Sequence, residues 1–337
     1  MTRTIERVRT FPPPPEIDDV TRREFLIGAA GLLLLPAGCG EQGGGEQSGQ
    51  TRTMKHVLGE TEVPVNPRRI VSLSDQAELA ALMALGVKPV ATGMRDEEFL
   101  PWIRRAGVGG VETFPIDSQA IPIEKVATCG PDLIIGQEGF VELVPDELGQ
   151  IAPTVATTSQ DWRECVTQVA DAVGEPEKGR DLLRQAEERI GETGERLAAY
   201  EGLEVSMFYC YPGEITMMPT DGMLGAELLR EMGLERPPSQ RQATWEGDDR
   251  STISEERLEL LDADVIFAFD FSEEHGKALD ELEDSPLFGR LEGVRNGNYV
   301  RLDFDEFRSL YITSILAVPV GLEVLEREIT ALDPEIS

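Results

Sequence analysis

The chain has 337 residues, of which 40% are hydrophobic, and a formal net charge of −32. This length exceeds what one typical hydrophobic core holds, and it predicts two domains with accessory segments. Residues 1–38 carry five arginines and five acids, so the whole net charge belongs to the remaining chain. Such a negative field argues against nucleic acid or anionic lipid as a partner of the folded part.

The amino-terminal segment has the pattern of an export signal. Arg22 and Arg23 precede Phe-Leu and a run of about eleven apolar residues, too short to span a bilayer of ~30 Å. The paired arginines resemble a twin-arginine signal, and the small residues before Cys39 resemble a lipoprotein box in which this cysteine is lipidated. We expect a twin-arginine-type lipoprotein signal peptide over 1–38 and a flexible tether over 39–54. The protein is then exported and lipid-anchored on the outer face of the cytoplasmic membrane.

The other cysteines have no metal-binding spacing. Cys129, Cys165 and Cys210 each neighbour apolar residues, which favours buried free thiols. One disulfide among the three remains open.

Residues 55–160 alternate short apolar strands with helices. Strands are predicted over 69–74, 88–92 and 131–136, and helices over 77–85 and 123–127. This alternation predicts an α/β lobe with a parallel sheet covered on both faces. Ligands of such sheets bind beyond the carboxyl ends of the strands. We therefore expect the following residues on the rim of a cleft: Ser74, Asp75, Arg95, Gln137 and Glu138.

Residues 161–200 predict two consecutive connecting helices. Asp161 and Glu164 have the spacing of a capping box, Gly174 suits a helix end, and Pro176 suits a first turn. The second helix carries one narrow seam, spaced alternately by three and four residues: Leu183, Ala186, Ile190, Thr193, Leu197 and Tyr200. We interpret it as a strut of about 25 residues, roughly 37 Å long, between two lobes.

Residues 201–337 repeat the α/β scheme. Strands are predicted over 203–210, 264–269 and 298–302, helices over 223–232 and 254–261, and one long closing helix over 308–329. Asp264 opens a buried strand after a helix, at the spacing at which Asp132 does so in the first lobe. The echo agrees with two similar lobes.

Several short motifs occur in a recognisable order. They are Pro67-Arg-Arg-Ile-Val-Ser-Leu, Ala84-Leu-Gly-Val-Lys-Pro-Val90, Pro131-Asp-Leu-Ile-Ile135, Gly233-Leu-Glu-Arg-Pro237 and Asp262-Ala-Asp-Val-Ile266. With the strut and the export signal, they resemble the helical-backbone class (class III) of periplasmic binding proteins. That class serves ABC importers of ferric siderophores, haem and corrinoids.

The resemblance covers about residues 55–330 and implies a fold and a function. The fold is two Rossmann-like lobes joined by a single long helix, which permits only slight closure. The function is that of a monomeric solute-binding lipoprotein, which captures a ferric siderophore in the inter-lobe cleft and delivers it to an ABC permease. No enzymatic activity and no resident cofactor are implied.

The resemblance also implies one acidic residue on each lobe that docks on basic residues of the permease. The usual first-lobe position holds Ala80, so the role is carried over to the neighbouring acid Glu78. Glu227 is the second-lobe candidate, with Glu231 as its rival.

A ferric siderophore is bulky and rich in oxygen, and it shields its iron. Its site needs aromatic walls and arginine donors rather than metal ligands. The expected ligand-binding residues are Trp245, Arg241, Tyr209, Arg95, Arg308 and Tyr211. Direct metal capture is disfavoured because the chain has only two histidines, His56 and His275.

Two alternatives stay open. Haem needs an axial ligand, which Tyr209, Tyr211, Met217 or Met218 could supply, and a corrinoid is a further ligand of the same class. A tethered extracellular enzyme is the alternative from another class. It is disfavoured because the sequence has no Gly-x-Ser-x-Gly elbow, phosphate loop, zincin helix or dinucleotide fingerprint.

Overall fold

The computed structural model describes residues 50–117, 120–158, 161–218, 223–241, 251–272 and 276–332. These residues form a two-stranded hairpin and two five-stranded sheets, with helices between the strands. None of the helices in this part of the chain is long and apolar enough to cross a membrane. The expected export signal, with Arg22, Arg23 and Cys39, lies outside the described residues.

A hairpin that the sequence analysis did not predict opens the described part. It pairs β1 (Thr51–His56) with β2 (Gly59–Pro64) in antiparallel register. The glycine at its turn, Gly59, has φ of 135°, which an L side chain rarely adopts. β1 therefore begins inside the segment expected to be a flexible tether.

The first lobe contains an all-parallel sheet, as predicted. Its middle strands are buried runs such as Leu133-Ile-Ile135, because helices cover both faces of a parallel sheet. The strand order is β5 (Glu112–Pro115), β4 (Ala91–Met94), β3 (Ile70–Ser72), β6 (Leu133–Gln137) and β7 (Thr154–Thr157). Its helices are α2 (Ala77–Ala84), α3 (Pro101–Arg105), α4 (Ile123–Thr128), α5 (Glu138–Val141) and α6 (Pro145–Ile151).

The second lobe contains a mixed sheet. Its order is β10 (Thr252–Ile253), β9 (Glu214–Met217), β8 (Val205–Tyr211), β11 (Val265–Asp270) and β12 (Tyr299–Arg301). β8, β11 and β12 are parallel, whereas β9 folds back on β8 in an unpredicted hairpin whose turn contains Gly213 at φ 78°. Its first helical elements are α9 (Leu224–Glu231), the 3-10 helix η2 (Glu255–Leu261), α10 (Lys277–Glu283), η3 (Phe288–Arg290) and α11 (Glu292–Arg295).

The two aspartates that echo one another in the sequence have the same role. Asp132 accepts the backbone N–H groups of Arg68 and Arg69, at 2.8 and 2.9 Å, just where β3 begins. Asp264 accepts the N–H of Glu204 at 2.8 Å, just before β8. In each lobe the aspartate lies just before one strand and accepts from the backbone just before the neighbouring parallel strand. The repeated sequence pattern therefore marks the same contact in both lobes.

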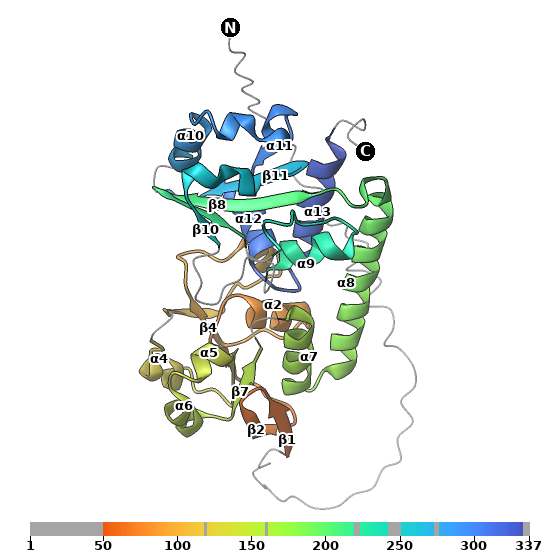
Figure 1. Cartoon of the computed structure of the whole chain (residues 1–337). Helices are drawn as coiled ribbons and strands as arrows, with labels where there is room; N and C mark the ends of the chain where they lie inside the picture. The colour runs from red at the N-terminus through yellow and green to blue at the C-terminus, as the bar shows by residue number, and fades with distance from the viewer. Residues whose placement is uncertain are drawn as a thin grey trace, which may run out of the picture. The chain divides into compact units, whose positions relative to one another are not determined.

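The connecting helices are α7 (Trp162–Ala172) and α8 (Pro176–Arg196), followed by the 3-10 turn η1 (Ala198–Tyr200). Asp161 caps α7 by accepting from the N–H groups of Arg163 and Glu164, as predicted. Glu164, however, accepts from Gln168 at 2.9 Å. Figure 1 shows α8 running beside both lobes, and it packs on α7, α9 and α13 (Val318–Thr330). Its seam is buried at Ala186, Ile190, Thr193 and Leu197.

Two glycines of α8 should respond oppositely to alanine. A Cβ at Gly179 would lie 2.5 Å from the Cβ of Ala170, whereas one at Gly191 meets no described atom within 4 Å. We expect Gly191→Ala to raise the free energy of unfolding by about 0.5–1 kcal/mol, because alanine is the better helix former. Gly179→Ala should lower it by about 1–3 kcal/mol, because α7 and α8 are forced apart. Urea unfolding measures both, and a gain from Gly179→Ala would contradict the close contact.

The predicted closing helix over 308–329 is wrong. Two helices occupy this region, α12 (Phe304–Tyr311) and α13. α12 begins earlier than predicted, with a capping box in which Asp303 and Glu306 each accept from the other's backbone N–H. The helix stops because Ile312 is extended, with ψ of 122°. Pro319 lies in the first turn of α13, where its missing N–H costs no hydrogen bond.

One cluster of buried apolar side chains runs through both lobes. It contains Leu79 of α2, Val166 of α7, Ile190 of α8 and Leu228 of α9. The packing is therefore continuous across the connecting helices, which fixes where the carboxyl ends of the two sheets lie.

Candidate functional site

The carboxyl ends of the two sheets meet. Asp96 follows β4 in the first lobe, and its Oδ2 lies 2.7 Å from Nη2 of Arg308, which α12 contributes from the second lobe. We call the surroundings of this contact the junction site. It comprises Asp75, Arg95, Asp96 and Phe140 from the first lobe, and Tyr209, Tyr211, Phe269, Phe271, Phe304, Phe307, Arg308 and Tyr311 from the second.

Seven of these residues form a continuous aromatic cluster, which we call the aromatic wall: Tyr209, Tyr211, Phe269, Phe271, Phe304, Phe307 and Tyr311. Two spacings produce it. Alternate residues of a strand share a face, so Tyr209 and Tyr211 of β8 lie beside Phe269 and Phe271 at the end of β11. On α12, the wall residues are three, four and seven positions apart, which also places them on one face.

The rings pack in the two geometries that aromatic quadrupoles favour. Tyr211 stacks on Phe271 with ring centroids 4.9 Å apart, and Phe269 stacks on Phe307 at 4.3 Å. Tyr209 meets its neighbours edge-on, with Phe271 at 5.4 Å. Burial, followed by the neighbouring tyrosines, raises the pKa of Tyr209, so this phenol stays neutral at physiological pH.

The wall passes from core to surface. Phe307 is 1% exposed, whereas Tyr211 is 42% and Phe304 47% exposed. Large exposed aromatic side chains are unusual unless something covers them. The outer end of the wall is therefore its solvent-accessible part.

Each lobe places an arginine over an aromatic face. The guanidinium of Arg95 lies 5.0 Å from the ring centroid of Phe140 in the first lobe. That of Arg308 lies 5.2 Å from Phe304 in the second lobe. Such contacts orient a guanidinium without using its N–H groups, which remain able to donate to oxygen.

A buried carboxyl adjoins this pair. Asp75 is 2% exposed, and within the described residues its Oδ1 has no hydrogen-bond partner. The pKa of Asp75 is raised from 3.8 to about 6, mainly by burial; Asp96 also raises it, whereas backbone hydrogen bonds and Arg308 lower it. The Nε of Arg308 is likewise buried without an acceptor in the described part. Within the described residues, the junction site thus contains one acceptor and one donor without a hydrogen-bond partner.

Four of the six expected ligand residues come together here: Tyr209, Tyr211, Arg95 and Arg308. Arg241 does not join them. It pairs with Glu235, donates to the backbone oxygen of Arg236 at 2.7 Å and lies 3.8 Å from Glu204, at the amino end of β8. Tyr209 and Tyr211 are at the opposite end of that strand. Trp245 lies outside the described residues.

The sequence analysis missed Phe304 and Phe307 because it began the last helix at Arg308, and it did not single out Tyr311 within that helix. The capping box at Asp303 was the available signal. Read from that residue, the helical spacing places all three aromatic residues on the face that carries Arg308.

The expectation that Glu78 docks on a permease is wrong. This side chain is 1% exposed, and Thr157 Oγ1 donates to its Oε1 at 2.7 Å. Burial raises the pKa of Glu78, which disfavours the charge that docking needs. The face of α2 that carries it packs inward, so no partner can reach it.

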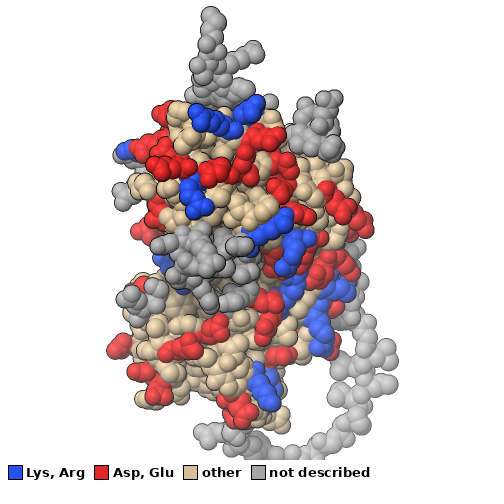
Figure 2. All heavy atoms as spheres, in the orientation of Figure 1, with Lys and Arg blue, Asp and Glu red and all other residues tan. Residues whose placement is uncertain are grey.

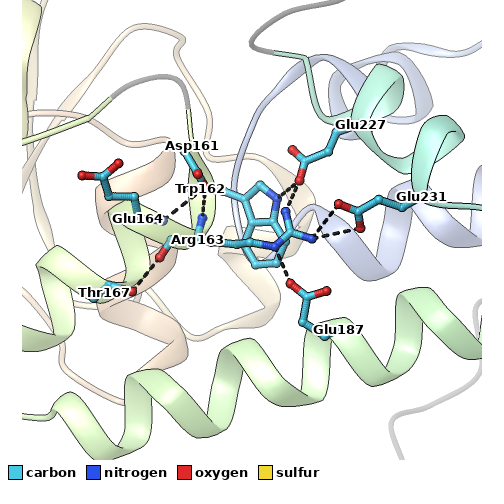
Figure 3. A network of polar contacts seen from close by, with 8 residues as sticks. All are labelled: Asp161, Trp162, Arg163, Glu164, Thr167, Glu187, Glu227 and Glu231. Atoms are coloured by element: carbon cyan, nitrogen blue, oxygen red, sulfur yellow. Dashed lines mark hydrogen bonds and ion pairs between the residues drawn. The ribbon is translucent and has the colours of Figure 1, made fainter.

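Glu227 belongs to an ion-pair network that joins the connecting helices to the second lobe (Figure 3). Arg163 of α7 pairs with Glu227 and, at 2.9 Å, with Glu231, both on α9, and it also pairs with Glu187 of α8. The indole N–H of Trp162 donates to Glu227 at 3.2 Å, and the Arg163 guanidinium lies 4.1 Å from the Trp162 ring. We call these residues the Arg163 network. Docking through Glu227 stays a prediction, and it would compete with Arg163.

Metal-ligating residues are not gathered in the described part, which holds no group of three or more His, Cys, Asp or Glu side chains arranged around a metal. His56 lies in the hairpin, with Nε2 3.0 Å from Thr61 Oγ1, and His275 lies outside the described residues. Cys129, Cys165 and Cys210 are buried free thiols, as predicted.

Comparison with known proteins identifies the family of this chain. Residues 116–306 match the periplasmic binding protein family. The chain is 32% identical over 268 residues to the probable siderophore-binding lipoprotein YfiY of Bacillus subtilis (strain 168), covering 76% of this chain and 81% of the relative. It is 25% identical over 302 residues to the iron(3+)-hydroxamate-binding protein YxeB of the same organism, covering 84% and 90%.

Among solved structures, Staphylococcus aureus SirA complexed with staphyloferrin B has a TM-score of 0.71 at 22% identity, covering 83% of this chain and 99% of SirA. This likeness bears out the two-lobed α/β fold. The family match spans more than half of the chain, and together with the 32% identical relative it shows that this protein belongs to the periplasmic binding proteins, which bind solutes rather than transform them.

Proposed function

We propose that the protein captures a ferric siderophore at the junction site and delivers it to an ABC permease. The observation that carries this proposal is the exposed end of the aromatic wall, at Tyr211 and Phe304, with an arginine from each lobe beside it. The relatives named for siderophore and iron(3+)-hydroxamate binding support the same ligand class.

The chemistry of the wall suits a chelate that already coordinates its iron. Aromatic faces cover the organic shell of such a ligand, and guanidinium groups donate to its oxygens. Arg308 Nε is a buried donor without an acceptor in the described residues, so a ligand oxygen there would satisfy it. No protein side chain needs to touch the iron. The iron enters as cargo of the chelate.

The export and anchoring of the protein belong to the same proposal. The twin-arginine motif at Arg22 and Arg23 would export the folded chain, and lipid on Cys39 would hold it on the outer face of the cytoplasmic membrane. Relatives named as lipoproteins support the anchor. We further propose that the protein acts as a monomer, with lobes over about 55–160 and 201–337 and the connecting helices over 161–200, and that Glu227 or Glu231 meets the permease.

Quenching of tryptophan fluorescence by a ferric siderophore tests the function and the site together. We expect saturable quenching by the wild-type protein and a roughly tenfold or larger loss of affinity in the Tyr211→Ala, Phe304→Ala double variant, since each aromatic contact contributes about 0.5–1.5 kcal/mol beyond burial. Both rings are exposed, so the melting temperature should hardly change. Leu287→Ala is the matched control, because Leu287 is also exposed and apolar, at 36%.

The outcomes separate the alternatives. Unchanged affinity in the double variant would place the ligand elsewhere. Binding of haem or cobalamin, with a shift in their absorbance and no response to ferric siderophores, would favour the haem or corrinoid reading of the same class instead.

A further inference from the structure

We propose that Asp96 makes the junction site a charge filter, which favours a ferric chelate of little net charge over a polyanionic one. This inference rests on the proposed function and adds the class of chelate. It follows from the ion pair between Asp96 and Arg308, because a polyanion would need this arginine for itself.

The first observation is the pairing itself. Asp96 Oδ2 and Arg308 Nη2 are 2.7 Å apart, with 44% and 13% of the two side chains exposed. Arg308 is therefore largely withdrawn from water, and its attraction to Asp96 is only partly screened. An anionic ligand meets an arginine whose charge a carboxylate of the other lobe already balances.

The second observation is the charge that surrounds the pair. Arg95 and Arg308 are the arginines of the junction site, and Asp75 and Asp96 are its aspartates. Asp305 lies within the electrostatic reach of Arg104, Arg105 and Arg308, and Arg104 is itself paired with Glu98 at 2.6 Å. On the face drawn in Figure 2, acidic side chains are spread over both lobes. Within the described residues, the four arginines (Arg95, Arg104, Arg105 and Arg308) are matched by four acids (Asp75, Asp96, Glu98 and Asp305), which leaves a ligand no excess of positive charge.

A polyanionic chelate has two costly choices. It can leave the Asp96–Arg308 pair intact and place its charge against Asp75, Asp96 and the acidic surface. It can instead displace Asp96 from Arg308, which leaves two neighbouring carboxylates without that cation. Like charges at such distances cost about tenfold or more in affinity.

An uncharged chelate avoids both costs. A ferric trihydroxamate offers oxygens that carry partial rather than full charge. The donor that remains in the described part, Arg308 Nε, can meet one of them while Nη2 stays on Asp96. The aromatic wall then holds the remaining surface of the ligand. The geometry thus suits a ligand whose recognition is mainly apolar and dipolar.

Removing the charge of Asp96 with little change of shape tests the filter. We would titrate wild type and Asp96→Asn with an uncharged ferric trihydroxamate and with a trianionic ferric tricatecholate, following tryptophan quenching. Wild type should prefer the trihydroxamate. Asp96→Asn should bind the tricatecholate more tightly, so that the ratio of the two affinities shifts roughly tenfold towards the tricatecholate. The matched control is Asp146→Asn, the same change at an exposed residue of α6, which should leave the preference unaltered.

Salt gives an independent test on the unmodified protein. Because the pair is partly exposed, raising the ionic strength should narrow the gap between the two chelates in wild type. A wild type that prefers the tricatecholate, or an Asp96→Asn variant that binds both chelates equally less well, would overturn the filter and leave siderophore capture standing. A protein that binds neither these nor any other ferric chelate would overturn the proposed function itself.

Discussion

Replacing Phe307 by alanine is expected to lower the free energy of unfolding by about 3–5 kcal/mol. Phe307 is 1% exposed, and it stacks on Phe269 while meeting Tyr209, Phe271 and Tyr311 at their edges or at a tilt. The truncated side chain would leave a cavity that four rigid rings cannot fill. Urea unfolding of the purified protein measures the loss.

Phe304→Ala is the control, since this residue is in the same helix and the same wall but is 47% exposed. It should change stability by less than about 1 kcal/mol. Similar losses in both variants would mean that the wall is not divided into a structural inner part and an accessible outer part, as the exposures indicate.

Asp75→Asn should stabilise the protein at pH 8 by up to about 3 kcal/mol and hardly at all at pH 4. The pKa of Asp75 rises from 3.8 to about 6 on folding, mainly because the carboxyl is buried. Two pKa units at 1.36 kcal/mol each give this magnitude. The folded state holds the proton more tightly, so ionisation opposes folding.

The pH window follows from the same two values. Below about pH 4 the carboxyl is protonated in both states, so wild type suffers no penalty. The penalty grows between about pH 4 and 6 and stays constant above, where asparagine escapes it. Urea unfolding at pH 4 and pH 8 checks this, with Asp284→Asn, an exposed position after α10, as the control. Equal gains at both pH values would show that ionisation of Asp75 is not the cause.

Local patterns predicted the parts of this fold that depend on neighbouring residues. Asp161 caps α7, Gly174 has φ of 78° behind it, and Pro176 begins α8, each for a reason that lies within a few positions. The strand at 133–137 was predictable because a parallel sheet buries both of its faces. The predicted start of the closing helix was wrong, although the sequence contains the signal for the true start, the capping box of Asp303 and Glu306.

Glu78 shows a different kind of failure. On α2, five consecutive residues from Glu78 to Leu82 are buried, so hydrophobic periodicity does not show on which side of the helix the acid lies. Which residue faces α7 depends on tertiary packing. Arg241 was a similar case, because sequence places it in a loop but cannot say at which end of β8 that loop lies.

The candidate site was predictable only in part. Tyr209 and Tyr211 were expected in the site from the sequence, and both belong to the aromatic wall. The partner of Arg308 could not be predicted from the sequence, because Asp96 is 212 positions away and no local pattern joins the two residues. Selectivity that depends on this pair becomes visible only when both lobes are in place.

The Arg163 network limits how far the two lobes can move relative to each other. One guanidinium draws carboxylates from α8 and α9 onto α7, and all four side chains are at most about half exposed. A wide hinge opening of the lobes would stretch all the ion pairs of Arg163 at once. A small rotation about Arg163 would keep them. We therefore expect the angle between the lobes to change only slightly when a ligand enters or leaves.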